Sequence, residues 1–250
     1  MTFTRDEILY GALTLEQPLP GPRVNVDTIL LSAWVRPPFP PSKGGVLEMG
    51  CASGAVLLLL ALRFPNVPRL TGMDIQKALV EMAGRNALEN GLSDRVSFFE
   101  GDVRTVDTTL PPRSYSTVVM NPPYEEPGRG RLRASREEQT ARQGFFCAPD
   151  DVARAARHLL PFRGRLYLIF KAARVAELLT ALRSQELEPK RIRFVHPLPG
   201  RPSSVVLVEA SAGGKPGMVV EPPLYIEDGH GSYTEELMKA YTKEGLPCHS

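Results

Sequence analysis

The stretch "YSTVVMNPPY" (115–124) joins an apolar run to an amide, two prolines and an aromatic ring. Neither proline has a backbone N–H to donate, so a strand formed by the apolar run must end there. The side-chain oxygen of Asn121 and the carbonyl of Pro122 can then accept the two N–H groups of an amine, and Tyr124 can stack on a planar group. Because the prolines fix φ, both acceptors are pre-placed. The pattern indicates chemistry on a poorly nucleophilic nitrogen, in adenine, in guanine or in a glutamine amide.

Three other apolar runs also end in residues suited to binding a ligand. The run "GGVLEMGCASG" (44–54) ends in small residues, Gly50, Ala52 and Ser53, which let a ligand approach the backbone closely. Its spacing is not G-x-G-x-x-G, so it does not match a nicotinamide or flavin fingerprint. Asp74 ends the next run, about 20 residues further on, where an acid can accept hydrogen bonds from a ribose diol. Asp102 ends the third run, where it can accept from the amine of an adenine.

Segments of strand and helix character alternate along the chain. This alternation predicts an α/β fold, with a parallel sheet covered on both faces by right-handed crossovers. The short link between the last two expected strands permits an antiparallel pair at the sheet edge. The strands are expected at 44–50, 69–74, 95–102, 115–121, 164–170, 190–197 and 203–210, and the helices at 54–64, 76–91, 149–161 and 173–186.

The domain organisation follows from length and composition. A chain of 250 residues with 42% hydrophobic content suits one α/β domain and excludes extended disorder. We expect an N-terminal extension (1–40) with a helix at 24–35, and a catalytic domain (41–212). The C-terminal tail (213–250) is expected to carry a short helix and to pack on that same domain.

Composition also excludes several functional classes. No apolar run approaches the roughly 20 residues that span a bilayer, and the N-terminus has no signal-peptide pattern, which predicts a cytoplasmic protein without membrane contact. The three cysteines and four histidines are dispersed, so neither a disulfide framework nor a metal site is expected. The net charge is only +2, but five arginines and two glutamates lie between positions 128 and 142. Such a local basic segment suits contact with a phosphate backbone.

The ordered set of glycine turn, Asp74, Asp102 and Asn-Pro-Pro-Tyr resembles the motif series of class I S-adenosylmethionine-dependent methyltransferases, and its last motif is similar to that of the amino-group members. The resemblance implies a Rossmann-like fold, with a seven-stranded, mostly parallel sheet that has an antiparallel edge strand. It implies S-adenosyl-L-methionine as the cofactor and Asn121, Pro122 and Tyr124 as the catalytic residues. The implied cofactor-binding residues are Arg23, Asp27, Glu48, Gly50, Ala52, Ser53, Asp74, Ile75, Asp102, Val103 and Asn121.

Two segments outside the central motifs make the resemblance specific to one group of methyltransferases. "LPGPRVNVDTILLSAWV" (19–35) and "PPLYIEDGHGSYTEELMKAY" (222–241) are similar to segments of bacterial tRNA adenine-N6 methyltransferases that modify the adenosine beside the anticodon of valine tRNA. In that family an arginine and an aspartate of the N-terminal segment lie near the cofactor, and Arg23 and Asp27 match them by position. The glycine turn departs from the commoner Asp-Leu-Gly-Thr-Gly type. The implied partner is RNA, most favourably tRNA, with phosphates contacted by Arg129, Arg131, Arg133 and Arg136.

Three functions stay open at this level. The favoured one is N6-methylation of an unpaired adenine in RNA, in a tRNA anticodon loop. The second is methylation of a protein glutamine or of a guanine amine in ribosomal RNA. The third is a non-catalytic RNA-binding protein that retains the methyltransferase fold. DNA adenine methyltransferases usually carry an added recognition domain, for which this chain has no room.

Overall fold

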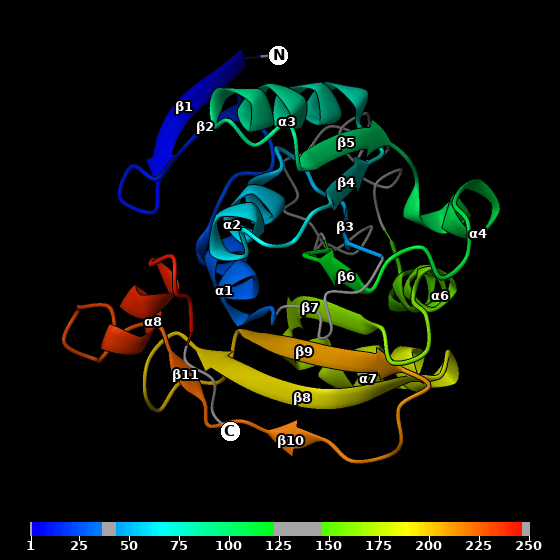
Figure 1. Cartoon of the computed structure of the whole chain (residues 1–250). Helices are drawn as coiled ribbons and strands as arrows, with labels where there is room; N and C mark the ends of the chain where they lie inside the picture. The colour runs from blue at the N-terminus through cyan, green and yellow to red at the C-terminus, as the bar shows by residue number, and fades with distance from the viewer. Residues whose placement is uncertain (1, 37–43, 123–146, 247–250) are drawn as a thin grey trace, which may run out of the picture.

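The computed structural model describes residues 2–36, 44–122 and 147–246, and shows a central sheet between two layers of helices (Figure 1). The strands are β1 (Thr2–Ile8), β2 (Leu13–Leu19), β3 (Val46–Met49), β4 (Leu70–Asp74), β5 (Val96–Glu100), β6 (Thr117–Met120), β7 (Arg165–Lys171), β8 (Leu187–His196), β9 (Val205–Ala212), β10 (Val219–Val220) and β11 (Leu224–Tyr225). The helices are α1 (Val26–Trp34), α2 (Ala55–Arg63), α3 (Lys77–Glu89), α4 (Val106–Thr109), α6 (Pro149–Leu159), α7 (Val175–Ser184) and α8 (Glu235–Ala240), with 3-10 turns η1 (Val103–Thr105) and η2 (Ala172–Arg174).

The order of strands confirms the predicted α/β, Rossmann-like fold. The described part of the central sheet has the order β10-β8-β9-β7-β6-β3-β4-β5, and β11 also pairs with β8. Strands β5, β4, β3, β6 and β7 run parallel, whereas β9 is antiparallel to both β7 and β8. The antiparallel strand therefore lies inside the sheet and not at its edge, because β8 takes the outer place and the two short strands extend it. Strands of two residues are too short to give a periodic signal in the sequence.

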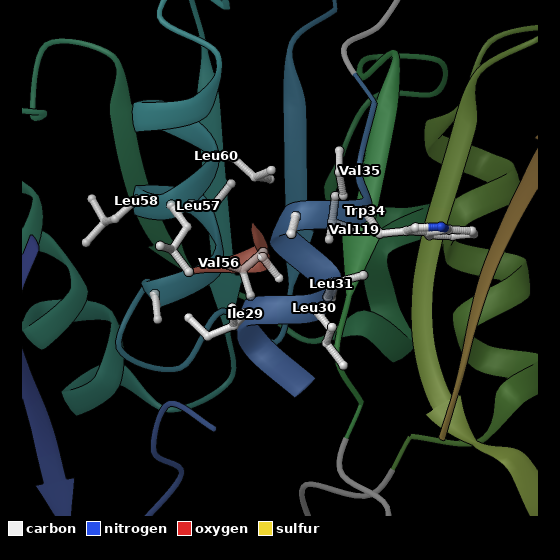
Figure 2. Packing of buried hydrophobic residues seen from close by; sticks show 14 of the residues in the cluster. Ile29, Leu30, Leu31, Trp34, Val35, Val56, Leu57, Leu58, Leu60 and Val119 are labelled. Atoms are coloured by element: carbon white, nitrogen blue, oxygen red, sulfur yellow. The ribbon is translucent and has the colours of Figure 1, made fainter. Parts of the chain in front are cut away.

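The sheet is buried on both faces, as a parallel sheet between helices must be. Neighbouring residues of β6 point to opposite sides, with Val118 in the core under α4, α6 and α7 and Val119 in the core under α1, α2 and α8. Figure 2 shows Ile29 of α1 beside Val56 of α2, whereas Leu30 and Leu31 lie on the side of α1 toward Val119 of the sheet. Each buried aliphatic side chain of this kind contributes about 1.5–3 kcal/mol.

The N-terminal segment contains more structure than the predicted helix. Strands β1 and β2 form an antiparallel hairpin, which we call the N-terminal hairpin, before α1 begins. Asn25 caps α1, because its side chain accepts from the backbone N–H of Thr28 at 3.1 Å. Leu13 and Leu15 of the hairpin and Leu237 of α8 share one core with α1. The division into extension, catalytic domain and tail stays a prediction. No helix in the described ranges is long and apolar enough to cross a membrane.

Gly54, the residue before α2, gives a test of this packing. Its φ of 84° is left-handed, and an added Cβ would lie 2.7 Å from the ring of Phe98. We expect Gly54→Ala to lower the free energy of unfolding by more than about 1 kcal/mol, the cost of the left-handed conformation alone. Gly84→Ala on the exposed face of α3, with no atom within 4 Å of the added Cβ, should instead stabilise by about 0.5–1 kcal/mol. Urea denaturation measures both; equal changes would contradict the proposed constraint at Gly54.

Candidate active site

The carboxyl ends of β3, β4, β5 and β6 surround one cavity of about 690 Å³. Ligands of open α/β sheets bind at this edge, and the volume lies within the roughly 300–1,000 Å³ usual for small-molecule sites. The lining also includes the segment that leads from the N-terminal hairpin into α1. Its members are Gly21, Pro22, Arg23, Val24, Asn25, Thr28, Glu48, Gly50, Cys51, Ala52, Ser53, Ala55, Val56, Asp74, Ile75, Gln76, Leu79, Gly101, Asp102, Val103, Arg104, Met120, Asn121 and Pro122.

The structure brings most of the predicted site residues together around this cavity. All the predicted cofactor-binding residues line it except Asp27, which lies on the first turn of α1 between the lining residues Asn25 and Thr28. Pro122 lines it as well. Tyr124 and the four arginines predicted to bind RNA lie outside the described residues. The lining residues that the sequence did not indicate include Pro22, Val24, Asn25, Thr28, Gln76 and Arg104.

Asp74, at the end of β4, holds the glycine turn that follows β3. Its Oδ2 accepts from the backbone N–H of Ala52 at 2.9 Å, and its Oδ1 accepts from that of Gln76 at 2.9 Å. Gly50 and Ala52 both have positive φ, 71° and 46°. A positive φ is unusual for alanine, and the bond from its backbone N–H to Asp74 fixes Ala52 in this conformation. Burial raises the pKa of Asp74, although these backbone hydrogen bonds act in the opposite direction. A carboxylate has about four acceptor positions, so Asp74 can still accept from a diol.

Glu48 lies in β3, two residues before Gly50 of the same turn, and is 2% exposed. Burial raises the pKa of its carboxyl well above the ordinary value, the Leu57 backbone amide lowers it, and the charge of Asp74 raises it further. Its Oε2 has no hydrogen-bond partner within the described part of the chain, and the residue lines the cavity. A buried oxygen without a partner is costly, so a ligand that donates a hydrogen bond, such as an amino-acid ammonium, fits here.

Asp102 begins η1 and is held by Arg104. The carboxylate accepts from the backbone N–H of Arg104 at 2.8 Å, and from its guanidinium Nε at 2.9 Å and Nη2 at 2.6 Å. These bonds to Arg104 lower the pKa of Asp102, so the group stays ionised at neutral pH. An ionised carboxylate is acceptor-only and suits the N–H donors of an adenine amine. Arg104 was not expected at the site, because an arginine two residues after an acid is common in sequences.

Arg23 also lines the cavity and is held by the N-terminal hairpin. Its guanidinium donates to Thr4 Oγ1 at 2.7 Å and to Asp6 Oδ2 at 2.8 Å. Gln17 donates to the same oxygen of Asp6 at 2.7 Å, and its own side-chain oxygen accepts from the backbone N–H of Val24 at 2.7 Å. The hairpin thus positions the backbone and side chain of this wall.

Asn121 and Pro122 follow directly after β6, and both line the cavity. Met120 is paired with Met49 across the sheet, so Asn121 lies in register with Gly50 of the glycine turn. The amide is half-buried and the proline is buried. The two acceptors predicted for an amine therefore lie beside the acids predicted for a nucleoside.

Residues 46–133 match a family model described as a methyltransferase domain. A tRNA1(Val) (adenine(37)-N6)-methyltransferase of Porphyromonas gingivalis is 30% identical over 75% of this chain and 73% of its own length. The protein of the same name from Vibrio parahaemolyticus is 26% identical over 88% of this chain and 87% of its own length.

Solved structures show the same fold. A predicted O-methyltransferase of Agrobacterium tumefaciens aligns with a TM-score of 0.70, over 88% of this chain and 98% of that one, at 23% identity. TrmN from Thermus thermophilus aligns with a TM-score of 0.52, over 75% of this chain and 48% of that one, at 21% identity.

The raised pKa of Asp74 predicts how cofactor binding depends on pH. The ionised carboxylate accepts both bonds of a ribose diol, whereas the protonated form must donate. We expect the affinity for S-adenosylhomocysteine to fall as the pH is lowered through the pKa of Asp74. Since burial places that pKa above the ordinary 3.8, the fall should begin at a higher pH than for an exposed aspartate. Isothermal calorimetry across acidic pH measures the profile.

Two variants separate this effect from general acid sensitivity. Asp74→Asn should bind about 10- to 100-fold more weakly at neutral pH, as expected for losing a hydrogen bond to a charged group worth about 1.5–3 kcal/mol, and its profile should be flatter. Glu100→Gln is the matched control, since Glu100 is paired with Asp74 in the sheet, is exposed and does not line the cavity. An unchanged pH profile in Asp74→Asn would show that titration of Asp74 does not govern ligand binding.

Proposed function

The chain belongs to the tRNA1(Val) (adenine(37)-N6)-methyltransferase family, and from that premise we propose that it methylates N6 of an unpaired adenine in a tRNA anticodon loop. The protein is an S-adenosyl-L-methionine-dependent methyltransferase. The observation that best supports the target is the position of Asn121 and Pro122. They provide two fixed acceptors for an amine beside a cavity whose acids suit a nucleoside.

When bound, S-adenosyl-L-methionine supplies a methyl group already activated on a sulfonium. The adenine nitrogen is a poor nucleophile, because its lone pair is delocalised into the ring. Oδ1 of Asn121 accepts one N–H of the amine and the carbonyl of Pro122 accepts the other, which turns the lone pair out of conjugation. Held in this way by Asn121 and Pro122, the nitrogen would be aimed at the methyl group that the cofactor would supply, and the surplus proton of the methylated amine would pass to water. Positioning of this kind can lower a barrier by about 7–11 kcal/mol.

The remaining site residues hold the cofactor in this proposal. Asp74 accepts from the ribose hydroxyls, Asp102 accepts from the adenine amine, and Glu48 accepts from the amino-acid ammonium. Val103 and Ile75, which follow the two aspartates along the cavity wall, cover the faces of the adenine. Gly50, Ala52 and Ser53 bring the backbone close to the ligand. In this arrangement Asp102 binds the adenine end of one extended molecule, Asp74 binds its ribose in the middle, and Glu48 binds its amino-acid end.

The RNA is proposed to be tRNA, as the names of the relatives state for those proteins. An anticodon-loop base is unpaired, so it can enter the cavity at little unstacking cost. We propose that Tyr124 stacks on this base and that the arginines at 129, 131, 133 and 136 contact the flanking phosphates. A tRNA substrate is compatible with the predicted cytoplasmic location.

The acceptor role of Asn121 can be tested by Asn121→Ala. We expect methyl transfer to tRNA to fall at least about 100-fold, the usual order for losing one positioned hydrogen-bonding group, while the affinity for S-adenosylhomocysteine stays within a few-fold. Asn66→Ala makes the same change at an exposed position after α2, at the far end of that helix from the cavity, and should leave both quantities unchanged. Single-turnover assays and calorimetry give the two readouts.

Nucleoside mass spectrometry of total tRNA, with and without the gene, tests the target. Loss of N6-methyladenosine from tRNA upon deletion is the expected result. An unchanged tRNA profile would favour a protein glutamine or a ribosomal guanine as the target. Near wild-type activity of Asn121→Ala would contradict the mechanism, and failure of the wild-type protein to bind S-adenosylhomocysteine would instead favour a non-catalytic RNA-binding role.

The arginine segment predicts the salt dependence of tRNA binding. Each phosphate contact contributes roughly 0.7–0.9 to the slope of log affinity against log salt concentration. Changing Arg129, Arg131, Arg133 and Arg136 to glutamine should therefore make the slope shallower by up to about 3, as measured by filter binding. Arg183→Gln is the control, because this exposed arginine lies at the end of α7, before β8 begins. An unchanged slope in the fourfold variant would remove these arginines from the interface.

A further inference from the structure

Asn86 of α3 is completely buried, with 0% exposure, although α3 is otherwise an amphipathic surface helix. All of its side-chain hydrogen-bonding groups face backbone from two distant segments. Its Oδ1 accepts from the backbone N–H of Glu16 at 2.8 Å, and its Nδ2 donates to the carbonyl of Glu16 at 3.0 Å. The same Nδ2 donates to the carbonyl of Ser53, in the glycine turn, at 2.9 Å. One side chain thus joins the N-terminal hairpin to the turn at the cavity.

Asn90, one helical turn later, binds the hairpin in the same way but makes no bond to the glycine turn. Its Oδ1 accepts from the backbone N–H of Thr14 at 3.0 Å, and its Nδ2 donates to the carbonyl of Thr14 at 2.7 Å. Thr14 and Glu16 lie two apart on β2, and their N–H and C=O groups point to the side away from β1, where a third strand would pair. The two amides replace the N–H and C=O groups of that strand, so they satisfy the free edge of the hairpin.

The hairpin fixed in this way holds the segment 21–25, which follows it and lines the cavity. Gln17 of β2 holds the backbone of Val24, and Asp6 of β1 holds the guanidinium of Arg23. Ser53, in the glycine turn, is 3% exposed and also lines the cavity. Asn86 therefore links the hairpin, which holds Arg23 and Val24, to the glycine turn, and it does not itself line the cavity.

We propose that Asn86 is a positioning residue for the cofactor: through its bond to Ser53 it fixes the glycine turn, with the N-terminal hairpin as its support. This proposal rests on the proposed function, since it concerns the same cavity. The amide cannot be inverted or replaced by a carboxylate, because either change would set an oxygen against the carbonyls of Glu16 and Ser53. Asn90 docks the hairpin without contacting the glycine turn, so it provides a matched comparison.

The test compares Asn86→Ala with Asn90→Ala in the full chain. Both variants should be less stable than the wild type, because each removes bonds to the hairpin. Only Asn86→Ala should weaken S-adenosylhomocysteine binding, by about tenfold, the size expected when one buried hydrogen bond that orders a site is lost. The KM for S-adenosylmethionine should rise by a similar factor, with kcat within a few-fold. If Asn86 served only to stabilise the fold, it would not raise the KM while leaving kcat nearly unchanged.

Two results would overturn the inference. One is unchanged affinity in a folded Asn86→Ala protein; the other is equal weakening in Asn90→Ala, which would assign the effect to hairpin docking in general. If the wild-type protein itself does not bind S-adenosylhomocysteine, the proposed function fails instead.

Hydrogen exchange of the wild-type protein tests the same proposal even if Asn86→Ala does not fold. Hydrogen exchange should slow on addition of S-adenosylhomocysteine at the backbone amide of Glu16, together with those of the glycine turn. Protection confined to the glycine turn and the end of β4, with no change along β2, would contradict the proposal.

Discussion

The site depends on one carboxylate that joins two strand ends. Asp74 accepts from the amides of Ala52 and Gln76, and so it fixes both the turn after β3 and the start of the chain that leads into α3. The turn must be held because Gly50, Ala52 and Gly54 all have left-handed backbone, and one of them is not glycine. With the turn fixed, α2 begins in the correct place to bury its aliphatic residues against α1 (Figure 2). The bond that shapes the cavity thus also orients the core.

Three acids line the cavity, Glu48, Asp74 and Asp102, and their surroundings shift their pKa values in different directions. Burial raises the pKa of Glu48 and of Asp74, whereas Arg104 lowers the pKa of Asp102. The first two lie deep, where an ionised group needs donors from a ligand to offset its lost hydration. Asp102 lies at the rim and carries its own counter-charge. A ligand with a cationic end and hydroxyls inside the cavity, and a neutral amine at the rim, matches this distribution.

The parts of the site that depend on short local motifs could be predicted from the sequence. The glycine turn, Asp74 and Asn-Pro follow or end their strands as expected, because glycine turns, strand-terminal acids and prolines have fixed backbone consequences, whereas β5 ends at Glu100, two residues before Asp102. The hairpin was missed, although "LTLEQ" alternates apolar and polar residues, because Pro18, Pro20 and Pro22 give this region the composition of a loop. Asn86 could not have been found in this way. An asparagine on a helix is usually exposed, and its burial depends on β2, a strand 70 residues away in sequence.

The N-terminal segment 19–35 and the C-terminal tail meet at Trp34 of α1. Trp34 donates to Glu221 at 3.1 Å, and the guanidinium of Arg191 lies 4.2 Å from the centre of the Trp34 ring and 3.0 Å from Glu221. A buried ion pair adds little net stability, because desolvating both charges offsets their attraction. It does penalise a shifted pairing, since a displaced Glu221 would leave Arg191 with an incomplete set of counter-charges. The pair therefore sets the register of β10 on β8, and with it the path of the tail across α1, the helix whose first turn lines the cavity.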